Sequence, residues 1–246
     1  MKLKGKLIIV TGATGGIGRE LVKVLDTENA KLVLIAKEEK KLKNILKTLR
    51  GQENSYFVSD FSKQEDVIRL SGAIKTKCKS IDILINLAGI GVYKPLETVT
   101  LEDWNNSLNV GLNAPFILIK ELIKLLGKNT DSLVLNIGSG MGVIPTAGRS
   151  VYCSTKFGLR GLTLSLAEEY RGVKPSFCLI TLGSTLTSFG PMSLKEKMEE
   201  QFKGKAYFTP EWVAKKLIEI IKDDKRETEY TIYPGDYDLG WWKKPQ

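Results

Sequence analysis

Short apolar runs of strand length alternate with longer amphipathic segments along nearly the whole chain. The apolar runs are rich in Val, Ile and Leu and lie at 7–10, 32–35, 56–58, 81–85, 133–137 and 177–180. Parallel strands joined by helical crossovers are buried on both faces, so they read as continuous apolar runs. The pattern therefore predicts an α/β fold, a single doubly wound parallel sheet of about seven strands with helices on both faces.

The segments between these runs have helical periodicity. Helices are expected at 17–25, 38–49, 63–77, 101–126, 151–170 and 211–222. Asp60 or Ser62 is predicted to cap the third of them, and Thr209 the last. An α/β chain of 246 residues suits one domain, so we assign residues 1–246 to a single domain. Residues 184–208 interrupt the pattern, and we predict that they form a lid over the substrate.

The chain contains no histidine, and its three cysteines are Cys78, Cys153 and Cys178. Catalysis by Ser-His-Asp or Cys-His is thereby excluded, and no metal site is expected. Acid–base chemistry must use Tyr, Lys, Asp or Glu. The first apolar run is too short for a signal peptide, and no run is long enough to span a membrane. We therefore expect a cytoplasmic protein with reduced thiols and no membrane partner.

A formal net charge of +9 raises the question of a nucleic-acid partner. The densest basic run, 37–47, alternates with Glu38, Glu39 and apolar residues. This is the composition of a solvated amphipathic helix, and it lacks the interleaved aromatic residues of many nucleic-acid sites. We expect no nucleic-acid partner. Nucleic-acid binding driven by net charge alone is kept as one alternative function.

A glycine-rich turn follows the first apolar run and leads directly into a helix. Its sequence, TGATGGIG at 11–18, has the spacing GxxxGxG rather than the common GxGxxG. Glycines allow a tight turn and let backbone N–H groups approach a pyrophosphate at the helix N-terminus. The other interpretation is a turn that only packs a helix closely on a strand. The cofactor contacts predicted here are Gly12, Thr14, Gly15, Gly16, Ile17 and Gly18.

Tyr152 and Lys156 lie four residues apart, so a helix places them on one face. A free tyrosine is a poor acid–base group at neutral pH. An adjacent ammonium group favours the phenolate and brings the pKa toward the working range. On its own, this spacing is also typical of a surface pair.

Together, the glycine turn and the Tyr152/Lys156 pair resemble the short-chain dehydrogenase/reductase family. The sequence NLAG at 86–89 and Ser139 strengthen the resemblance, which covers nearly the whole chain. It implies a Rossmann fold, Tyr152 as proton donor or acceptor, Ser139 as the hydroxyl that orients the carbonyl, and Lys156 holding the nicotinamide ribose. The further cofactor contacts that we predict are Asn86, Ala88, Gly89, Tyr152, Lys156, Gly183, Thr185 and Thr187.

The cofactor type depends on the end of the second apolar run. An NAD enzyme places a carboxylate there for the ribose 2′-hydroxyl, and this chain has Ala36 followed by Lys37. Lys37 is expected to meet the 2′-phosphate as a point charge, which favours NADP(H) over NAD(H). A surface lysine is the alternative, and Gly15 occupies a place where many NADP-preferring relatives carry a second basic residue. Asp60 and Phe61 are expected beside the adenine.

One position departs from the family pattern at the catalytic site. The family has an Asn seven residues after a Trp on the long helix, and counting from Trp104 gives Gly111. Glycine keeps the backbone carbonyl and tolerates a local kink, so the resemblance still implies an oxidoreductase. The alternative is a cofactor-binding sensor or scaffold with little turnover, against which Ser139, Tyr152 and Lys156 argue.

The resemblance also implies a substrate class and an assembly. We expect a small carbonyl or secondary alcohol substrate, and a substrate carried on an acidic carrier protein, as in 3-oxoacyl carrier protein reductases, is one alternative. We also expect a homodimer or homotetramer in which the helices at 101–126 and 151–170 pack against a second subunit. On the first helix, the apolar positions for this contact are Phe116, Ile119, Ile123 and Leu126.

Overall fold

A seven-stranded, entirely parallel sheet forms the centre of the computed structural model, which describes residues 1–241. The strand order is β3-β2-β1-β4-β5-β6-β7. The predicted fold class is confirmed. The strands are β1 (Leu7–Thr11), β2 (Lys31–Ala36), β3 (Ser55–Val58), β4 (Ile83–Asn86), β5 (Leu133–Ile137), β6 (Ser176–Leu182) and β7 (Glu229–Ile232).

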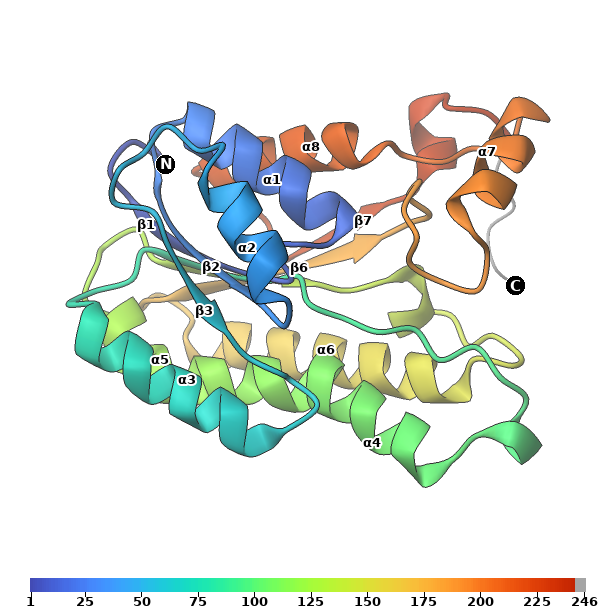
Figure 1. Cartoon of the computed structure of the whole chain (residues 1–246), viewed down its shortest axis with the longest axis horizontal. Helices are drawn as coiled ribbons and strands as arrows, with labels where there is room; N and C mark the ends of the chain where they lie inside the picture. Colours follow the sequence, from blue (N-terminus) through green and yellow to red (C-terminus); the bar gives the residue numbers. More distant parts are fainter. Residues whose placement is uncertain (242–246) are drawn as a thin grey trace.

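Helices cover both faces of the sheet (Figure 1). On one face lie α1 (Gly16–Thr27), α2 (Glu39–Leu46) and α8 (Pro210–Lys222). On the other lie α3 (Gln64–Lys77), α4 (Leu101–Leu108), α5 (Ala114–Leu126) and α6 (Ser150–Glu169). Two clusters of buried hydrophobic side chains, one on each face, form the core. No helix within residues 1–241 combines the length and apolarity needed to cross a bilayer.

Of the two helix caps expected from the sequence, the cap of α8 is confirmed and the cap of α3 is not. The Thr209 side chain accepts a hydrogen bond from the Trp212 N–H at 3.1 Å and caps α8, as predicted. The predicted cap of α3 is wrong, because α3 begins at Gln64 with Lys63 before it and no side chain among the described residues caps it. The Asp60 carboxylate instead accepts hydrogen bonds from the backbone and hydroxyl of Ser62. It therefore stabilises the turn before the helix.

The helix expected over 101–126 is interrupted. A π-helical turn at Asn109–Asn113 separates α4 from α5, and Gly111 lies within it. A Cβ atom at Gly111 would lie 2.4 Å from the Thr155 Cγ2 atom on α6. The close approach of the two helices at this point therefore requires glycine, which gives a packing reason for the absence of an Asn at this position.

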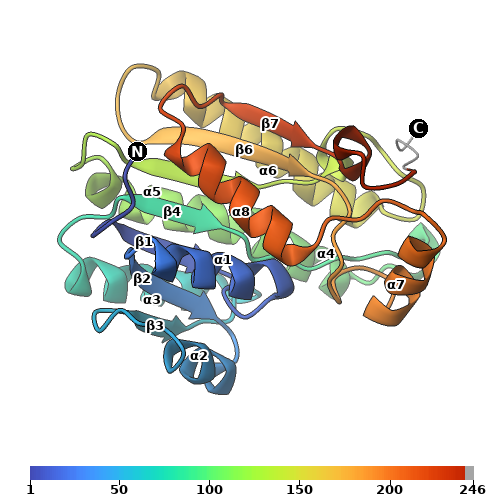
Figure 2. The same cartoon turned by 90° about the horizontal axis from the view of Figure 1, so that it is seen from above.

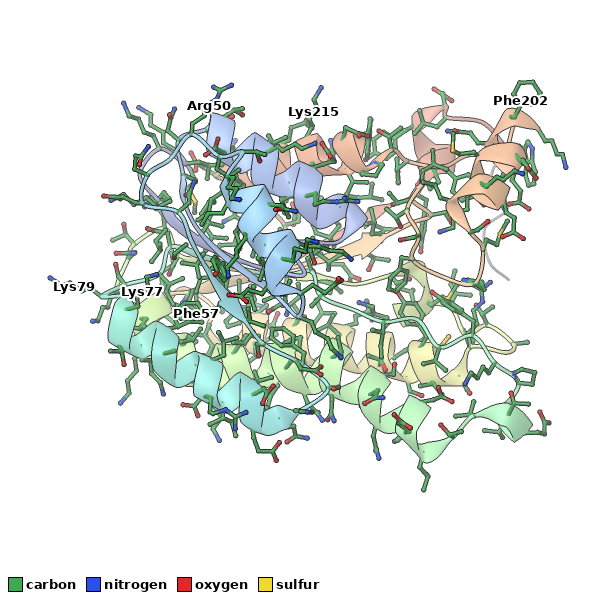
Figure 3. The ribbon with its side chains drawn as sticks, viewed as in Figure 1. Arg50, Phe57, Lys77, Lys79, Phe202 and Lys215 are labelled. Carbon is green, nitrogen blue, oxygen red and sulfur yellow. The ribbon has the colours of Figure 1, made fainter. Side chains whose placement is uncertain are left out.

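The segment 184–208 contains a short helix, α7 (Leu194–Phe202), which lies beyond the carboxyl ends of the strands (Figure 2). The two ends of the segment are held together, because Thr185 and Phe208 form an isolated β-bridge. On α7, Leu194, Met198 and Phe202 are exposed, and Phe202 projects away from the molecule (Figure 3). Lys197 on the same helix is buried, so α7 directs a cation inward and apolar side chains outward.

The order of the strands also fixes where a ligand can bind. The chain runs from β1 outward to β3 and then returns to β4 beside β1. In an open α/β sheet this reversal leaves a crevice at the carboxyl ends of the two adjacent strands. The turns after β1 and β4 meet there, since the Thr11 hydroxyl accepts hydrogen bonds from the Leu87 and Ala88 N–H groups, each at 3.1 Å.

Candidate active site

The glycine turn after β1 adopts a conformation that few other residues allow. Gly12 has a φ of +67°, and a Cβ atom there would lie 2.9 Å from the backbone of Ala88. A Cβ atom at Gly18 would lie 2.2 Å from the Gly12 carbonyl oxygen, so Gly18 lets α1 pack directly against the turn. The glycines therefore bring the N-terminus of α1 to the crevice.

That N-terminus opens onto a cavity of about 570 Å³. Gly15 precedes the helix, and no side chain of residues 1–241 caps its first turn, so the first N–H groups of α1 have no side-chain acceptor there. The buried Ser59 hydroxyl, which lines the same cavity, also has no hydrogen-bond partner in the described part of the chain. An uncapped helix N-terminus and a free hydroxyl suit a phosphate-bearing nucleotide. Of the predicted cofactor residues, this cavity is lined by Gly12, Thr14, Gly15, Gly16, Ile17, Gly18, Lys37, Asp60, Phe61, Ala88, Gly89 and Thr187.

Lys37 lies at the far end of this cavity and is paired. Its Nζ atom is 2.9 Å from an Asp60 carboxylate oxygen, and the Lys37 side chain is 73% exposed. Burial raises the pKa of Asp60, but hydrogen bonds from Lys37 and Ser62 outweigh burial and hold the pKa below its ordinary value. Asp60 therefore stays ionised, and its carboxylate partly neutralises the charge of the Lys37 ammonium group. A phosphate bound at this end would compete with Asp60 for the ammonium group.

A second cavity of about 290 Å³ continues from the first, and five residues line both: Ile17, Leu87, Gly89, Thr187 and Phe189. The three residues predicted as catalytic, Ser139, Tyr152 and Lys156, all line this second cavity, together with Gly183 and Thr185. They come from the end of β5, from α6 and from the end of β6. The fold therefore brings the predicted catalytic group to one side of the predicted cofactor site.

Asn86 is the exception among the predicted cofactor residues. It is buried in β4, and its Nδ2 atom donates to the Asn136 Oδ1 atom at 2.8 Å. It lines neither cavity described above. The predicted contact between the Asn86 side chain and the cofactor is therefore not supported, because this side chain links β4 to β5.

Tyr152 is in an aromatic environment. Its ring centroid lies 5.4 Å from that of Tyr93 and 5.9 Å from that of Phe189. Burial raises the pKa of Tyr152 well above its ordinary value, and the Tyr93 phenol raises it further. A hydrogen bond with Ser139 offsets this only in part. The phenol is therefore protonated at neutral pH.

Lys156 does not lower the pKa of Tyr152 as the sequence led us to expect. Its Nζ atom lies 5.8 Å from the Tyr152 ring centroid and donates to the Ile137 carbonyl at 2.8 Å. Burial lowers the pKa of Lys156 to about 8. The expectation was wrong for this geometry, because burial of the phenol dominates and the ammonium group binds a backbone carbonyl.

The residues of this cavity that were not found from the sequence include Tyr93, Arg149 and Lys197. The Arg149 guanidinium lies 5.1 Å from the centroid of the Tyr93 ring. Tyr93 and Lys197 come from irregular or weakly patterned segments, where no periodicity marks a side chain as inward-facing. Arg149 lies three residues before Tyr152, and this spacing is a signal that could have identified it.

Comparisons with known proteins agree with this geometry. The sequence model described as short chain dehydrogenase matches residues 6–197. The chain is 33% identical over 171 residues to a 3-oxoacyl-[acyl-carrier-protein] reductase of Salmonella typhimurium, covering 69% of each chain. It is 26% identical over 245 residues to an uncharacterized oxidoreductase of Staphylococcus saprophyticus, covering 96% of this chain and 99% of the relative.

Solved structures show the same fold. An alcohol dehydrogenase from the archaeon Thermococcus sibiricus, complexed with 5-hydroxy-NADP, has a TM-score of 0.81 at 26% identity, covering 93% of this chain and 96% of that one. A short chain dehydrogenase from Burkholderia cenocepacia in complex with NADP has a TM-score of 0.84 at 24% identity, covering 96% of this chain and all (100%) of that one. The chain belongs to the short-chain dehydrogenase/reductase family of oxidoreductases.

Proposed function

We propose that this protein transfers a hydride between NADP(H) and a carbonyl or secondary alcohol substrate, with Tyr152, Ser139 and Lys156 as its catalytic group. The observation that carries the proposal is the continuity of the two cavities. An uncapped helix N-terminus faces one of them, and a buried phenol, a hydroxyl and an ammonium group line the other. The relative from Thermococcus sibiricus, named an alcohol dehydrogenase, supports this assignment.

The glycine turn and the N-terminus of α1 would hold the pyrophosphate, and Asp60 and Phe61 would flank the adenine. Thr187 lies over the turn, since a Cβ atom on Gly16 would be 2.5 Å from the Thr187 Cγ2 atom. Lys156 would reach the ribose next to the nicotinamide. When bound, the dihydronicotinamide supplies the hydride that reduces the carbonyl carbon.

The protein's own groups manage the oxygen of the substrate. Tyr152 is protonated because burial raises its pKa, so it can donate its proton to the oxygen as negative charge develops there. Ser139 would donate a hydrogen bond to the same oxygen, which stabilises the charge before the proton arrives. The tyrosinate left behind is stabilised by Arg149, whose charge lowers the pKa of Tyr152.

We propose a preference for NADP(H) over NAD(H). Ala36 leaves the ribose 2′ position without a carboxylate, and Lys37 is at the adenine end of the cavity. The complex of the relative from Thermococcus sibiricus with 5-hydroxy-NADP is consistent with this preference. Asp60 limits the preference, because it already binds the Lys37 ammonium.

The direct test is loss of NADPH absorbance with a panel of ketones, diketones and 3-oxoacyl thioesters, with the alcohol product identified by mass. Reduction of at least one class, faster with NADPH than with NADH, is expected. The 3-oxoacyl thioesters address a carrier-borne substrate, as the name of the relative from Salmonella typhimurium suggests. Tight NADPH binding without reduction of any carbonyl would favour the alternative of a cofactor-binding sensor or scaffold. It would overturn the proposal that the protein is an oxidoreductase with turnover.

We also propose a homodimer or homotetramer, with α5 and α6 at the contact. Of the apolar positions expected there, Ile119 and Leu126 are buried in the chain's own core and are unavailable. Phe116 on α5 and Phe157 on α6 are 47% and 42% exposed. Light scattering should show an assembly that Phe116→Lys with Phe157→Lys dissociates. A monomer at micromolar concentration for the unmodified protein would contradict the proposal.

A further inference from the structure

The cavity around Tyr152 has an unusual distribution of charge. Four cationic side chains line it, and within residues 1–241 no carboxylate does. Two of the four cations are described above or have a carboxylate partner: Lys205 pairs with Glu200, and Lys156, proposed to be catalytic, binds the Ile137 carbonyl. Arg149 and Lys197 remain, and neither is paired with a carboxylate of the described chain.

Arg149 lies immediately before α6, one turn from Tyr152. Its guanidinium stacks over Tyr93, and one nitrogen lies 3.4 Å from the Met141 sulfur atom. A guanidinium carries five N–H donors, and a thioether sulfur is a weak acceptor. Most of the donors of Arg149 are therefore open to a ligand in the cavity.

Lys197 reaches the same region from α7. The residue is 8% exposed, and its Nζ atom donates to the Thr187 carbonyl at 2.9 Å and to the Phe189 carbonyl. An ammonium group has three donors, so one remains for a ligand. Burial lowers the pKa of Lys197, since a buried cation that binds only neutral carbonyls is poorly compensated. An anion beside it would supply that compensation.

The two cations border one end of the cavity. A Cβ atom on Gly190 would lie 3.8 Å from the Lys197 Nζ atom and 3.9 Å from the Tyr93 phenol oxygen. The Arg149 guanidinium lies 5.1 Å from the centroid of that same Tyr93 ring. Tyr93 thus contacts Tyr152 and borders a cationic region made by Arg149 and Lys197, which we call the anion end of the cavity.

We propose that the anion end binds a carboxylate of the substrate, so that the substrates are small oxo acids and the corresponding hydroxy acids. This rests on the proposed oxidoreductase function. The carbonyl would lie at Tyr152 and Ser139 and receive a hydride at carbon and the Tyr152 proton at oxygen, and the carboxylate would not react. The Tyr93 ring borders the anion end, and its centroid is 5.4 Å from that of Tyr152, a distance that suits a spacer of a few carbons. A cavity of about 290 Å³ also favours a small molecule.

The kinetic test compares each acid with its own neutral ester. Initial rates with NADPH are measured for 3-oxobutanoate and 4-oxopentanoate and for their methyl esters. The acids should have the higher kcat/KM, and Arg149→Leu should lower the acid-to-ester ratio by about 10- to 150-fold, the worth of a charge-assisted hydrogen bond. Arg149→Lys should recover part of the ratio. Arg171→Leu, which removes an exposed arginine just after α6, is the matched control. An unchanged ratio in Arg149→Leu, or a preference for the esters, would overturn the proposal.

A binding measurement separates this proposal from the proposed function. Pentanoate, which cannot be reduced, is titrated calorimetrically into the protein with and without NADP⁺. Binding should be weakened in Arg149→Leu and in Lys197→Met, and retained in Lys195→Met on the exposed side of α7. If neutral ketones are reduced but pentanoate does not bind, the anion end is wrong and the proposed function stands. If pentanoate binding depends on Arg149 but no carbonyl is reduced, the anion end stands and the proposed function is wrong.

Discussion

The two joined cavities are built in different ways. The larger cavity, where we propose that the cofactor binds, is called the cofactor end. It uses backbone: glycines at 12–18 present the N–H groups of one helix, and the positions follow one another in the sequence. The smaller cavity, where we propose that the substrate binds, is called the substrate end, and it uses side chains from separate segments, with Tyr93, Ser139, Tyr152 and Lys197 on four different elements or loops. A backbone site carries little charge and can be recognised locally. A side-chain site buries titratable groups and depends on the whole fold.

The largest effect should come from the substrate end. Tyr152→Phe removes the proton donor but keeps the ring between Tyr93 and Phe189, so kcat should fall by about 10²- to 10⁴-fold while NADPH affinity is retained. Steady-state kinetics and fluorescence titration with NADPH measure the two quantities. Tyr56→Phe, whose phenol lies outside both cavities and bonds to Glu39, is the control. More than about a tenth of the original turnover in Tyr152→Phe would contradict its role as the proton donor.

At the cofactor end, the one side chain expected to select the cofactor is Lys37. Lys37→Asp places a carboxylate near the ribose 2′ position, and the ratio of NADPH to NADH affinity should fall by about 10- to 150-fold. Titration of each cofactor measures the ratio. Lys41→Asp, on the exposed part of α2, reports the effect of net charge alone. Equal affinities for the two cofactors in the unmodified protein would show that Lys37 does not select between them.

The buried lysine of the substrate end should destabilise the fold. The pKa of Lys156 is lowered from 10.5 to about 8, so between these values the unfolded chain binds more protons than the folded one. The free energy of unfolding therefore rises with pH across that window. Below pH 8, Lys156 is charged in both states and its burial destabilises the fold by the full amount. The cost is about 3 kcal/mol, partly offset by about 1 kcal/mol from the bond to Ile137.

Lys156→Met should therefore raise the free energy of unfolding by about 2 kcal/mol at pH 7 and by less at pH 9.5. Urea unfolding without cofactor at the two pH values measures this change. The exposed Lys195→Met is the control. Equal pH dependence of Lys156→Met and the unmodified protein would show that Lys156 is not destabilised by burial.

The smallest effect concerns a glycine that lies outside both cavities. Gly111→Ala would press a methyl group against the Thr155 Cγ2 atom and should lower the free energy of unfolding by about 1–2 kcal/mol. Thr155→Ser deletes that methyl group but keeps the hydroxyl bonded to Ser107 and Val151, so the double variant should recover most of the loss. Cofactor affinity should not change. Additive effects of the two substitutions would argue against this contact.

The sequence predicted the sheet because buried parallel strands have continuous apolar runs. It missed the position of β7 because this strand lacks such a run. Glu229 and Tyr230 are only partly buried at the edge of the sheet, so that strand has no apolar run. The glycine turn and the Tyr152–Lys156 pair could be found because their residues are close in sequence. Tyr93 and Lys197 could not, since only the folded chain brings their segments to Tyr152.

The attachment of the 184–208 segment has a consequence for how the protein moves. Within residues 1–241, its backbone pairs with the rest of the chain only near its end, where Ala206 and Gly204 bond to Trp241. Its two ends pair with each other through Ser184, Leu186 and Phe208. Such a unit is expected to open without unfolding the sheet, so amide hydrogens on α7 should exchange far faster than those of β5. Lys197 ties α7 to the start of the segment through the Thr187 and Phe189 carbonyls, and a ligand that binds Lys197 would slow this exchange. Release of product would then be limited by the opening of α7, and turnover would respond to solvent viscosity.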